Sequence, residues 1–399
     1  MNVSAIPSAV KGWCPGALRP MMAGDGLLVR LRPRCGIVPQ AAALAIADCA
    51  ERFGNGLIEL TSRANLQLRG VRPETLQPLQ AALAQLGLLD ADAAGEAVRN
   101  IIASPLAGLD ARARLDIRPV VAALGARLAG DARLHALPGK FGFVVEDGGS
   151  FDLSGTRADV RFMAVEGGFA VFRAGSGNAF RVCAAAEVPD VAAEAAMAMM
   201  AAGSELLPQK PYSPLVRAEG LFAQHSCLGH HPAFTGLTRA FGRWTAAQWR
   251  KIAELAGELR LTPWRILLIP YATPHLAAVL ASQGNILDPA DPRLAVAACP
   301  GAPACAAGTT STQADALQLA TIARQLGTRN ITLHVSGCTK GCACHEKTPA
   351  TLVARDGLYD LVLDGGPGDP PSLTGLDLRC ATRALAALAR GGSLHGNFT

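Results

Sequence analysis

CPGAPAC at residues 299–305 and GCTKGC at residues 337–342 decide the fold of this chain. Five residues separate Cys299 from Cys305, and three separate Cys338 from Cys342. Glycine, proline and alanine surround these cysteines, so the backbone can approach the thiols closely. Four thiolates held in two loops are typical of a sulfide-bridged iron cluster, which takes one cysteine at each corner. The two stretches therefore predict a cluster bound by these four residues.

Other interpretations of the cysteines fit less well. Zinc sites usually pair cysteines two to four residues apart, so the wider gap of the first pair is unusual for zinc. The three-then-two spacing of radical-type clusters is absent, because a single residue separates Cys342 from Cys344. Four merely buried cysteines would require a coincidental pairing in glycine- and proline-rich loops. Cys344 and His345 are further donors nearby, and we expect them to be loop residues.

Composition narrows the class of protein. With 399 residues the chain can form two or three domains with buried cores. A net charge of +5, with no basic block interleaved with aromatic residues, argues against nucleic acid as a partner. No apolar span is long enough for a membrane helix, and residues 1–16 lack the layout of a signal peptide. We therefore expect a cytoplasmic protein without a membrane partner.

Eleven cysteines in a cytoplasmic chain indicate metal or redox chemistry rather than disulfides. Cys49 and Cys183 lie in apolar sequence, and we expect both to be buried, inert thiols. The densest histidine group is His225, His230 and His231, for which a ligand role and a structural role remain equally open.

The hydropathy pattern predicts a β-α-β order near the N-terminus, as in a ferredoxin-like half domain. Residues 24–34 alternate apolar with polar after a turn, and residues 40–53 have an apolar helical face. Two more strands follow, in 54–60 and 61–71, and residues 74–86 predict a second helix. Within the stretch 61–71, Arg63 and Arg69 are expected to alternate on one strand face.

A similar order returns after residue 221, with a helix predicted over 246–259 and a strand over 260–270. A T-x-x-R or T-P-W-R turn accompanies each copy, which indicates a degenerate internal repeat. Mixed α/β sequence follows each copy, giving an A-B-A′-B′ order. In the last segment we predict a helix over 312–326, three strands, and a final helix over 377–389.

We thus predict an α/β protein with mixed sheets, built as a pseudo-twofold repeat. The predicted segments are 1–88 (ferredoxin-like half domain), 89–215 (first larger domain), 216–285 (second half domain) and 286–399 (second larger domain, carrying the cluster).

The cysteine motif resembles that of the sirohaem-dependent nitrite and sulfite reductases, and the resemblance extends over nearly the whole chain. LTSRANLQLRG (60–70) is similar to the ring-binding strand of those enzymes, and VRNIIASPLAG (98–108) to the arginine-bearing loop that follows it. LPGKFGF (137–143) resembles their lysine-bearing loop. The resemblance implies ring-binding residues, which are Arg63, Asn65, Gln67, Arg69, Arg99 and Asn100. It also implies catalytic roles for Lys140 and Arg99.

One departure from the reductase pattern affects the expected chemistry. The reductases carry two lysines in the last loop, in the order K-F-K, whereas here the order is Lys140-Phe141-Gly142. A reductase that delivers protons to nitrite or sulfite would lack that positioned cation. Five stretches resemble the precorrin-3B synthase family, whose substrate is a ring with eight carboxylates: GWCPGALRPMMAGDGLLVRLRPR, LTSRANLQLRGV, LPGKFGFVVEDGG, LTPWR and SGCTKGCA. Arginines suited to sirohaem would suit that ring, because guanidinium pairs bidentately with carboxylate.

This family resemblance implies a monooxygenase that acts on precorrin-3A, with O2 and an electron donor such as NADH or a reductase as further partners. One oxygen atom would enter at C20 as a γ-lactone forms from the ring A acetate. The implied cofactors are a 4Fe-4S cluster on Cys299, Cys305, Cys338 and Cys342, and a mononuclear non-haem iron. Two alternatives stay open. One is a sirohaem-containing nitrite or sulfite reductase, and the other is a non-catalytic iron–sulfur carrier.

Overall fold

The fold was taken from a computed structural model, which describes residues 14–174, 176–202, 221–327 and 330–392. The chain divides into two compact units. The first unit consists of residues 1–21, 29–35 and 83–221. The second consists of residues 22–28, 36–82 and 222–399. Each unit is described by itself below.

Two five-stranded sheets are built from the half-domain sequences. One sheet has the order β1-β2-β5-β4-β13 and the other the order β11-β12-β15-β14-β3. The strands of the first are β1 (Met21–Ala23), β2 (Gly26–Leu31), β5 (Leu66–Val71), β4 (Leu57–Leu60) and β13 (Arg243–Thr245). Those of the second are β11 (Gly229–His231), β12 (Phe234–Leu237), β15 (Leu267–Pro270), β14 (Glu258–Leu261) and β3 (Ile37–Pro39).

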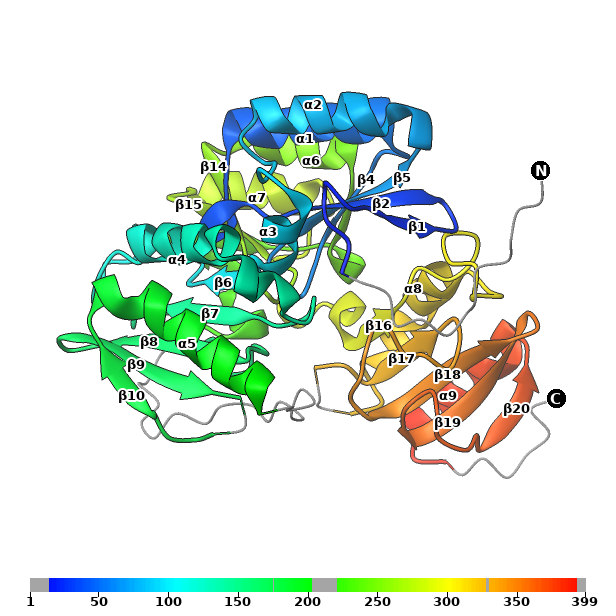
Figure 1. The fold of residues 1–399 in the computed structure, drawn as a ribbon. Coiled ribbons are helices and arrows are strands. Elements are labelled where there is room, and N and C mark those ends of the chain that lie inside the picture. The colour runs from blue at the N-terminus through cyan, green and yellow to red at the C-terminus, as the bar shows by residue number, and fades with distance from the viewer. Residues whose placement is uncertain (1–13, 175, 203–220, 328–329, 393–399) are drawn as a thin grey trace, which may run out of the picture. The chain divides into compact units, whose positions relative to one another are not determined.

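The two half domains exchange one short strand each. β3 comes from the first copy but pairs with β14 of the second, and β13 comes from the second copy but pairs with β4 of the first. Each exchanged strand leads directly into a helix, α1 (Gln40–Phe53) or α6 (Ala246–Leu255). These two helices pack together, as Figure 1 shows, and the Trp249 indole donates to the Ala43 carbonyl at 3.0 Å.

The turns before β5 and β15 repeat the same geometry. Thr61 and Thr262 occupy equivalent positions, and each hydroxyl accepts from the backbone N–H groups two and four residues later, at 3.2 to 3.3 Å. The third residue after each threonine, Ala64 or Arg265, has a positive φ, 52° or 61°. A turn of this kind uses the threonine as an internal acceptor. The internal repeat predicted from these motifs is thus present in the backbone.

Two larger α/β sheets share one topology. The sheet β10-β9-β8-β7-β6 and the sheet β16-β17-β18-β19-β20 each contain two parallel pairings followed by two antiparallel ones. The first has β6 (Ile101–Ala103), β7 (Phe143–Glu146), β8 (Val160–Val165), β9 (Gly168–Arg173) and β10 (Arg181–Cys183). The second has β16 (Val296–Ala298), β17 (Leu333–Ser336), β18 (Thr348–Arg355), β19 (Leu358–Gly365) and β20 (Leu373–Leu376).

Helices cover these sheets. In the first unit α4 and α5 lie side by side over β6 to β10 (Figure 1). In the second, α8 and α9 enclose a core of alanine and leucine with β16 to β19. The remaining bounds are α2 (Leu76–Gln85), α3 (Ala93–Val98), α4 (Arg118–Gly130), α5 (Val188–Ala201), α7 (Pro274–Ser282), α8 (Thr312–Ala323) and α9 (Leu378–Ala389).

Several local predictions need correction. The helix expected over 246–259 ends at Leu255, because Ala256 leaves the helical conformation and residues 258–261 form β14. The strand expected over 61–71 begins only at Leu66, so Arg63 lies in the turn and does not share a strand face with Arg69. The four predicted segment boundaries remain predictions, and the boundary at 215 falls outside the described residues.

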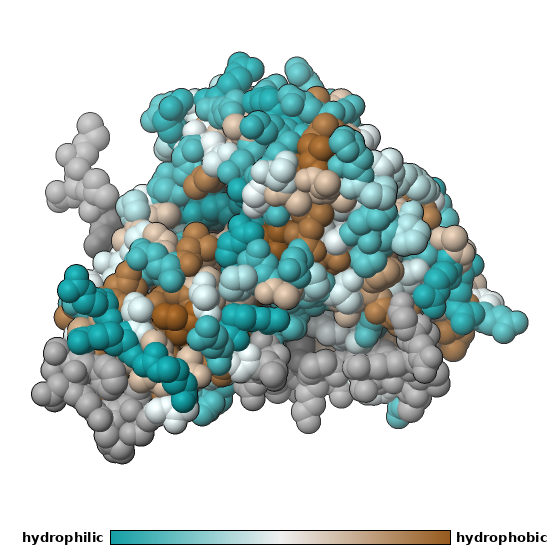
Figure 2. All heavy atoms as spheres, turned by 180° about the vertical axis from the view of Figure 1, so that it is seen from behind, coloured by the Kyte–Doolittle hydropathy of each residue, from teal (hydrophilic) through white to brown (hydrophobic). Residues whose placement is uncertain are grey.

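Figure 2 shows a face on which hydrophilic and apolar residues are interspersed. Among the described residues, none of the helices has the length and apolar character needed to cross a membrane. The cytoplasmic location remains a prediction.

Candidate functional site

The two cysteine loops leave neighbouring parallel strands at the same edge of their sheet. β16 ends at Ala298, directly before Cys299, and β17 ends at Ser336, two residues before Cys338. Because β16 and β17 are parallel and Ala298 lies opposite Val335, their carboxyl ends meet. Two cysteine pairs that are far apart in sequence are thereby brought to one place.

Backbone groups approach the cysteines closely. The N–H of Gly337 donates to the Cys299 sulfur at 3.1 Å, and a Cβ at position 337 would lie 3.3 Å from that sulfur. Gly301 has a positive φ of 63°, and a side chain there would meet the Thr310 carbonyl at 2.5 Å. Hydrogen bonds to cysteine sulfur are one way in which proteins tune iron–sulfur clusters. These glycines therefore fit a cluster cradle.

The electrostatics of Cys342 indicate that the four thiols are neighbours. Desolvation by neighbouring atoms raises the pKa of Cys342 although the residue is exposed, and the charges of Cys338, Cys299 and Cys305 raise it further. Thiols that oppose each other's ionisation in this way are stabilised as thiolates by a cationic iron centre. The donor set thus fits the predicted cluster.

The described residues do not form a site for a single metal ion. Among the described residues, no three His, Cys, Asp or Glu side chains are grouped so that they could hold one ion. A four-iron cluster takes each cysteine on a separate iron, so its thiols do not converge on one point. The described residues accordingly offer no ligand set for the mononuclear iron that the resemblance implied.

The predicted ring-binding strand β5 contacts the first cysteine loop. Arg69 donates from Nη2 to the Ala304 carbonyl at 3.2 Å, and the N–H of Gly24 donates to the same oxygen at 3.2 Å. Arg69 is only 4% exposed and forms a bidentate pair with Asp25 at 2.8 and 2.9 Å. The strand and the β1–β2 turn therefore hold the CPGAPAC loop in position.

Glu59 is the centre of a charge network in the same unit, which sequence reasoning missed. Its carboxylate accepts from Arg243 at 2.5 and 2.9 Å and from Gln67 at 3.1 Å, and it lies 3.5 Å from Arg69. Burial lowers the pKa of Arg265, and Glu59 is the main charge opposing that shift. The network uses Gln67 and Arg69, two of the predicted ring-binding residues, within the protein itself.

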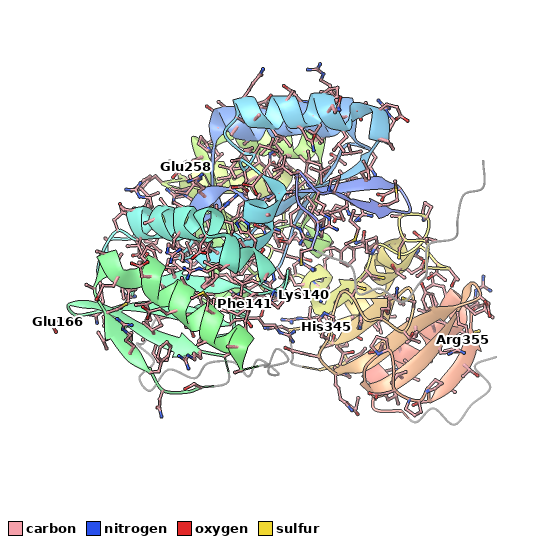
Figure 3. All side chains as sticks on the ribbon, in the orientation of Figure 1. Lys140, Phe141, Glu166, Glu258, His345 and Arg355 are labelled. Carbon is pink, nitrogen blue, oxygen red and sulfur yellow. The ribbon has the colours of Figure 1, made fainter. Side chains whose placement is uncertain are left out.

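The other predicted residues are distributed as follows. Arg63 is half-buried in the turn before β5, and Asn65 is buried next to that strand. In the first unit, the Asn100 amide donates to the carbonyls of Ala97, Gly139 and Phe141 at 3.1 to 3.2 Å. Asn100 thus anchors the loop that carries the exposed Lys140, which Figure 3 marks beside Phe141.

Arg99 is held by a carboxylate, and its neighbour Arg32 is not. Arg99 donates to both oxygens of Asp90 at 2.7 and 2.8 Å. Arg32 is 4% exposed, and none of its three guanidinium nitrogens has a hydrogen-bond partner among the described residues. Burial lowers the pKa of Arg32. No motif in the sequence singled out this residue.

Several other histidines and cysteines that the sequence singled out can be placed in the structure. His230 contacts the Thr235 hydroxyl at 3.1 Å, and His231 contacts the Leu228 carbonyl at 3.1 Å and packs against Phe222 and Phe234. His345 is exposed in the loop after β17, where Figure 3 marks it. Cys49 and Cys183 are buried as expected, and burial raises the pKa of both thiols.

His334, four residues before Cys338, is fully buried on β17. Leu333 and Val335 face the apolar core, so His334 faces the opposite side of the sheet. Neither ring nitrogen has a hydrogen-bond partner among the described residues. Burial, with a smaller contribution from the charge of His345, lowers the pKa of His334 to about 4.

Because His334 is buried without a hydrogen-bond partner among the described residues, we expect the protein to become less stable as the pH falls. Between pH 6.5 and about pH 4, His334 binds a proton in the unfolded chain but not in the folded chain. Stability therefore falls as the pH falls through this window, by about 3 kcal/mol in total. We expect His334→Leu to remove this component, as measured by urea unfolding at pH 7, 6, 5 and 4. His275→Leu, at an exposed histidine on α7, is the control. Parallel pH profiles for wild type and His334→Leu would contradict the prediction.

Comparisons with known proteins identify the family of this chain. Residues 19–86 match the family model of the nitrite/sulfite reductase ferredoxin-like half domain. The chain is 32% identical to a precorrin-3B synthase of Sinorhizobium sp., over 98% of this chain and 90% of that protein. It is 36% identical to a ferredoxin–nitrite reductase of Synechococcus elongatus, over 33% of this chain and 26% of that protein.

Among solved structures, the Mycobacterium tuberculosis NirA protein matches with a TM-score of 0.66 at 18% identity, over 93% of this chain and 82% of that chain. This likeness concerns the fold, and it confirms the predicted mixed α/β architecture. The identity to the Sinorhizobium protein extends along almost the full length of both chains, so this chain belongs to the precorrin-3B synthase family.

Proposed function

We propose that this protein is a precorrin-3B synthase, an oxidoreductase that converts precorrin-3A to precorrin-3B. The observation that carries the proposal is the match to a precorrin-3B synthase over 98% of the chain. In the proposed reaction one atom of O2 enters the ring at C20 and the other leaves as water. A donor such as NADH or a reductase supplies the two electrons required, and the ring A acetate closes the γ-lactone.

The cysteine cradle supports the redox part of this proposal. Cys299, Cys305, Cys338 and Cys342 would hold the 4Fe-4S cluster, which supplies one-electron transfer when it is bound. The Gly337 N–H, 3.1 Å from the Cys299 sulfur, would stabilise negative charge on that thiolate. We derive no step through a mononuclear iron, because the described residues offer no ligand set for one.

The loop around Lys140 supports a synthase over a reductase. Gly142 is buried, and its N–H donates to the Asp159 carboxylate at 2.7 Å. This position, where the reductases carry their second lysine, is therefore part of the internal packing of the loop. We propose Lys140 and Arg99 as the catalytic residues. Arg63 and Asn65 would contact the ring, whereas Gln67, Arg69 and Asn100 each hold a segment of their own unit.

The decisive experiment incubates anaerobically purified protein with precorrin-3A and a reductant, with and without isotopically labelled O2. We expect an oxygen-dependent mass gain of one labelled oxygen atom in the pigment. An unchanged pigment, together with six-electron reduction of nitrite or sulfite and a strong sirohaem absorption, would instead identify a reductase. A protein that carries the cluster but binds neither precorrin-3A nor sirohaem would be an iron–sulfur carrier.

A further inference from the structure

We infer that Arg32 is a binding residue for a carboxylate of the tetrapyrrole ring, an inference that rests on the proposed function. Arg32 follows β2 in the first unit and is 4% exposed. Its Nε, Nη1 and Nη2 atoms are all buried, and none has a hydrogen-bond partner among the described residues. A guanidinium carries five N–H donors and no acceptor, so this side chain presents a complete set of unused donors.

The surrounding carboxylates are already used by other groups. Glu96 is 3% exposed and accepts from the backbone N–H groups of Ala17 and Leu18, at 2.6 and 3.0 Å. Asp90 is held bidentately by Arg99. Neither acid forms an ion pair with Arg32 in the part of the chain that the structure describes, although both act on it electrostatically. The protein thus places two acids nearby without giving Arg32 an acceptor.

The position of Arg32 is fixed by its neighbours. Arg99 donates from Nη1 to the Arg32 carbonyl at 3.1 Å, so the Asp90–Arg99 pair holds the backbone of this residue. Glu96 holds the loop at Ala17 and Leu18, and a side chain at Gly16 would come within 2.1 Å of the Glu96 carboxylate. A buried guanidinium in such a fixed setting is prepared for a partner from outside the chain.

Energetics favour this inference over a structural role. A buried charge without a partner destabilises the folded protein, so an arginine with a purely structural role is expected to have an acceptor. Guanidinium matches the fork of a carboxylate bidentately, and the proposed substrate carries eight such groups. A charge that destabilises the ligand-free protein is then stabilising in the complex.

The inference predicts opposite effects of one substitution on stability and on binding. Arg32→Met removes the unpaired charge but keeps an apolar side chain of similar length. We expect the ligand-free variant to melt at the wild-type temperature or above it. Its affinity for precorrin-3A, measured without O2 by fluorescence titration, should fall about tenfold to a hundredfold. Arg32→Lys, which keeps the charge but not the fork, should give an intermediate affinity.

Arg112→Met, at an exposed arginine of the same unit, is the matched control and should change neither property. A lower melting temperature or failed folding of Arg32→Met would overturn the inference, because Arg32 would then have a structural partner. Unchanged affinity in that variant would overturn it as well. If inorganic phosphate stabilises the wild type through Arg32 while precorrin-3A binding is unaffected, the site takes a small anion and the ring assignment is wrong.

These outcomes separate the inference from the proposed function. Binding is measured without turnover, so a wild type that binds precorrin-3A through Arg32 but leaves it unchanged in O2 would contradict only the proposed activity. A wild type that converts precorrin-3A while Arg32→Met binds it equally well would contradict only the role of Arg32.

Discussion

Replacing Cys338 with alanine is expected to remove the iron–sulfur cluster, because one iron atom would lose its thiolate ligand. Activity is then expected to fall below about 1% of wild type, because the proposed electron transfer needs the cluster. Cys338 lies at the carboxyl end of β17, beside the loop that starts at Cys299 after the parallel strand β16. Alanine is preferred to serine, because a serine oxygen could still bind iron. Iron and sulfide content, the broad visible absorption and EPR of the reduced protein would be measured under anaerobic conditions.

Cys344→Ala provides the matched control for the cysteine experiment. Cys344 is half-buried two residues after Cys342, and its thiol contacts the Glu346 carbonyl at 3.5 Å. We expect this variant to keep its iron, sulfide and activity. Full iron content in Cys338→Ala would contradict the assignment of Cys338. Loss of the cluster in Cys344→Ala alone would show that Cys344, and not Cys338, is the fourth cluster ligand.

Replacing Glu59 with glutamine is expected to lower the free energy of unfolding by about 1 to 3 kcal/mol, because Arg243 would lose its counter-ion while Arg69 keeps Asp25. Glu59 is 12% exposed and faces Arg243 at 2.5 Å and Arg69 at 3.5 Å. Arg243 comes from the exchanged strand β13, so the same substitution weakens the junction of the two half domains. Urea unfolding at neutral pH measures the effect.

Glu51→Gln isolates the contribution of burial. Glu51 also faces an arginine at 2.5 Å, Arg250, but it is 47% exposed. We expect this variant to lose less than about 1 kcal/mol, because water screens an exposed pair. Equal losses in Glu51→Gln and Glu59→Gln would show that burial does not decide the strength of this network. A shift confined to the cluster signal, with stability unchanged, would contradict the structural role of Glu59.

Features encoded by local sequence could be predicted. The helix over 40–53 is found with the same bounds, because its apolar face and the glycine at its end are visible in a single stretch. The repeated threonine turns were indicated by their own motif, and the mixed α/β fold is confirmed by the likeness to NirA. The cysteine loops could likewise be recognised, since both pairs carry their spacing within a few residues.

Features that depend on distant partners could not be predicted. β3 and β13 have three residues each, too few for an alternating pattern, and their partners lie in the other half domain. The sequence pattern places Arg63 on a strand, because its spacing from Arg69 fits an alternating pattern. The turn at Thr61 is instead formed by hydrogen bonds from backbone N–H groups to the Thr61 hydroxyl, which the pattern does not show. Which arginines are paired, as Arg69 is, and which are not, as Arg32 is, depends on acids far away in the chain. The roles of the predicted ring-binding residues remain predictions.

The exchange of β3 and β13 has a consequence for how the protein is made. Glu59 on β4 and its partner Arg243 on β13 are 184 residues apart, so the edge of β4 stays open while the intervening chain leaves the ribosome. At ordinary rates of synthesis this interval is roughly ten to forty seconds. An open strand edge is a template for pairing with other chains. The nascent N-terminal half therefore exposes such an edge until β13 has been synthesised.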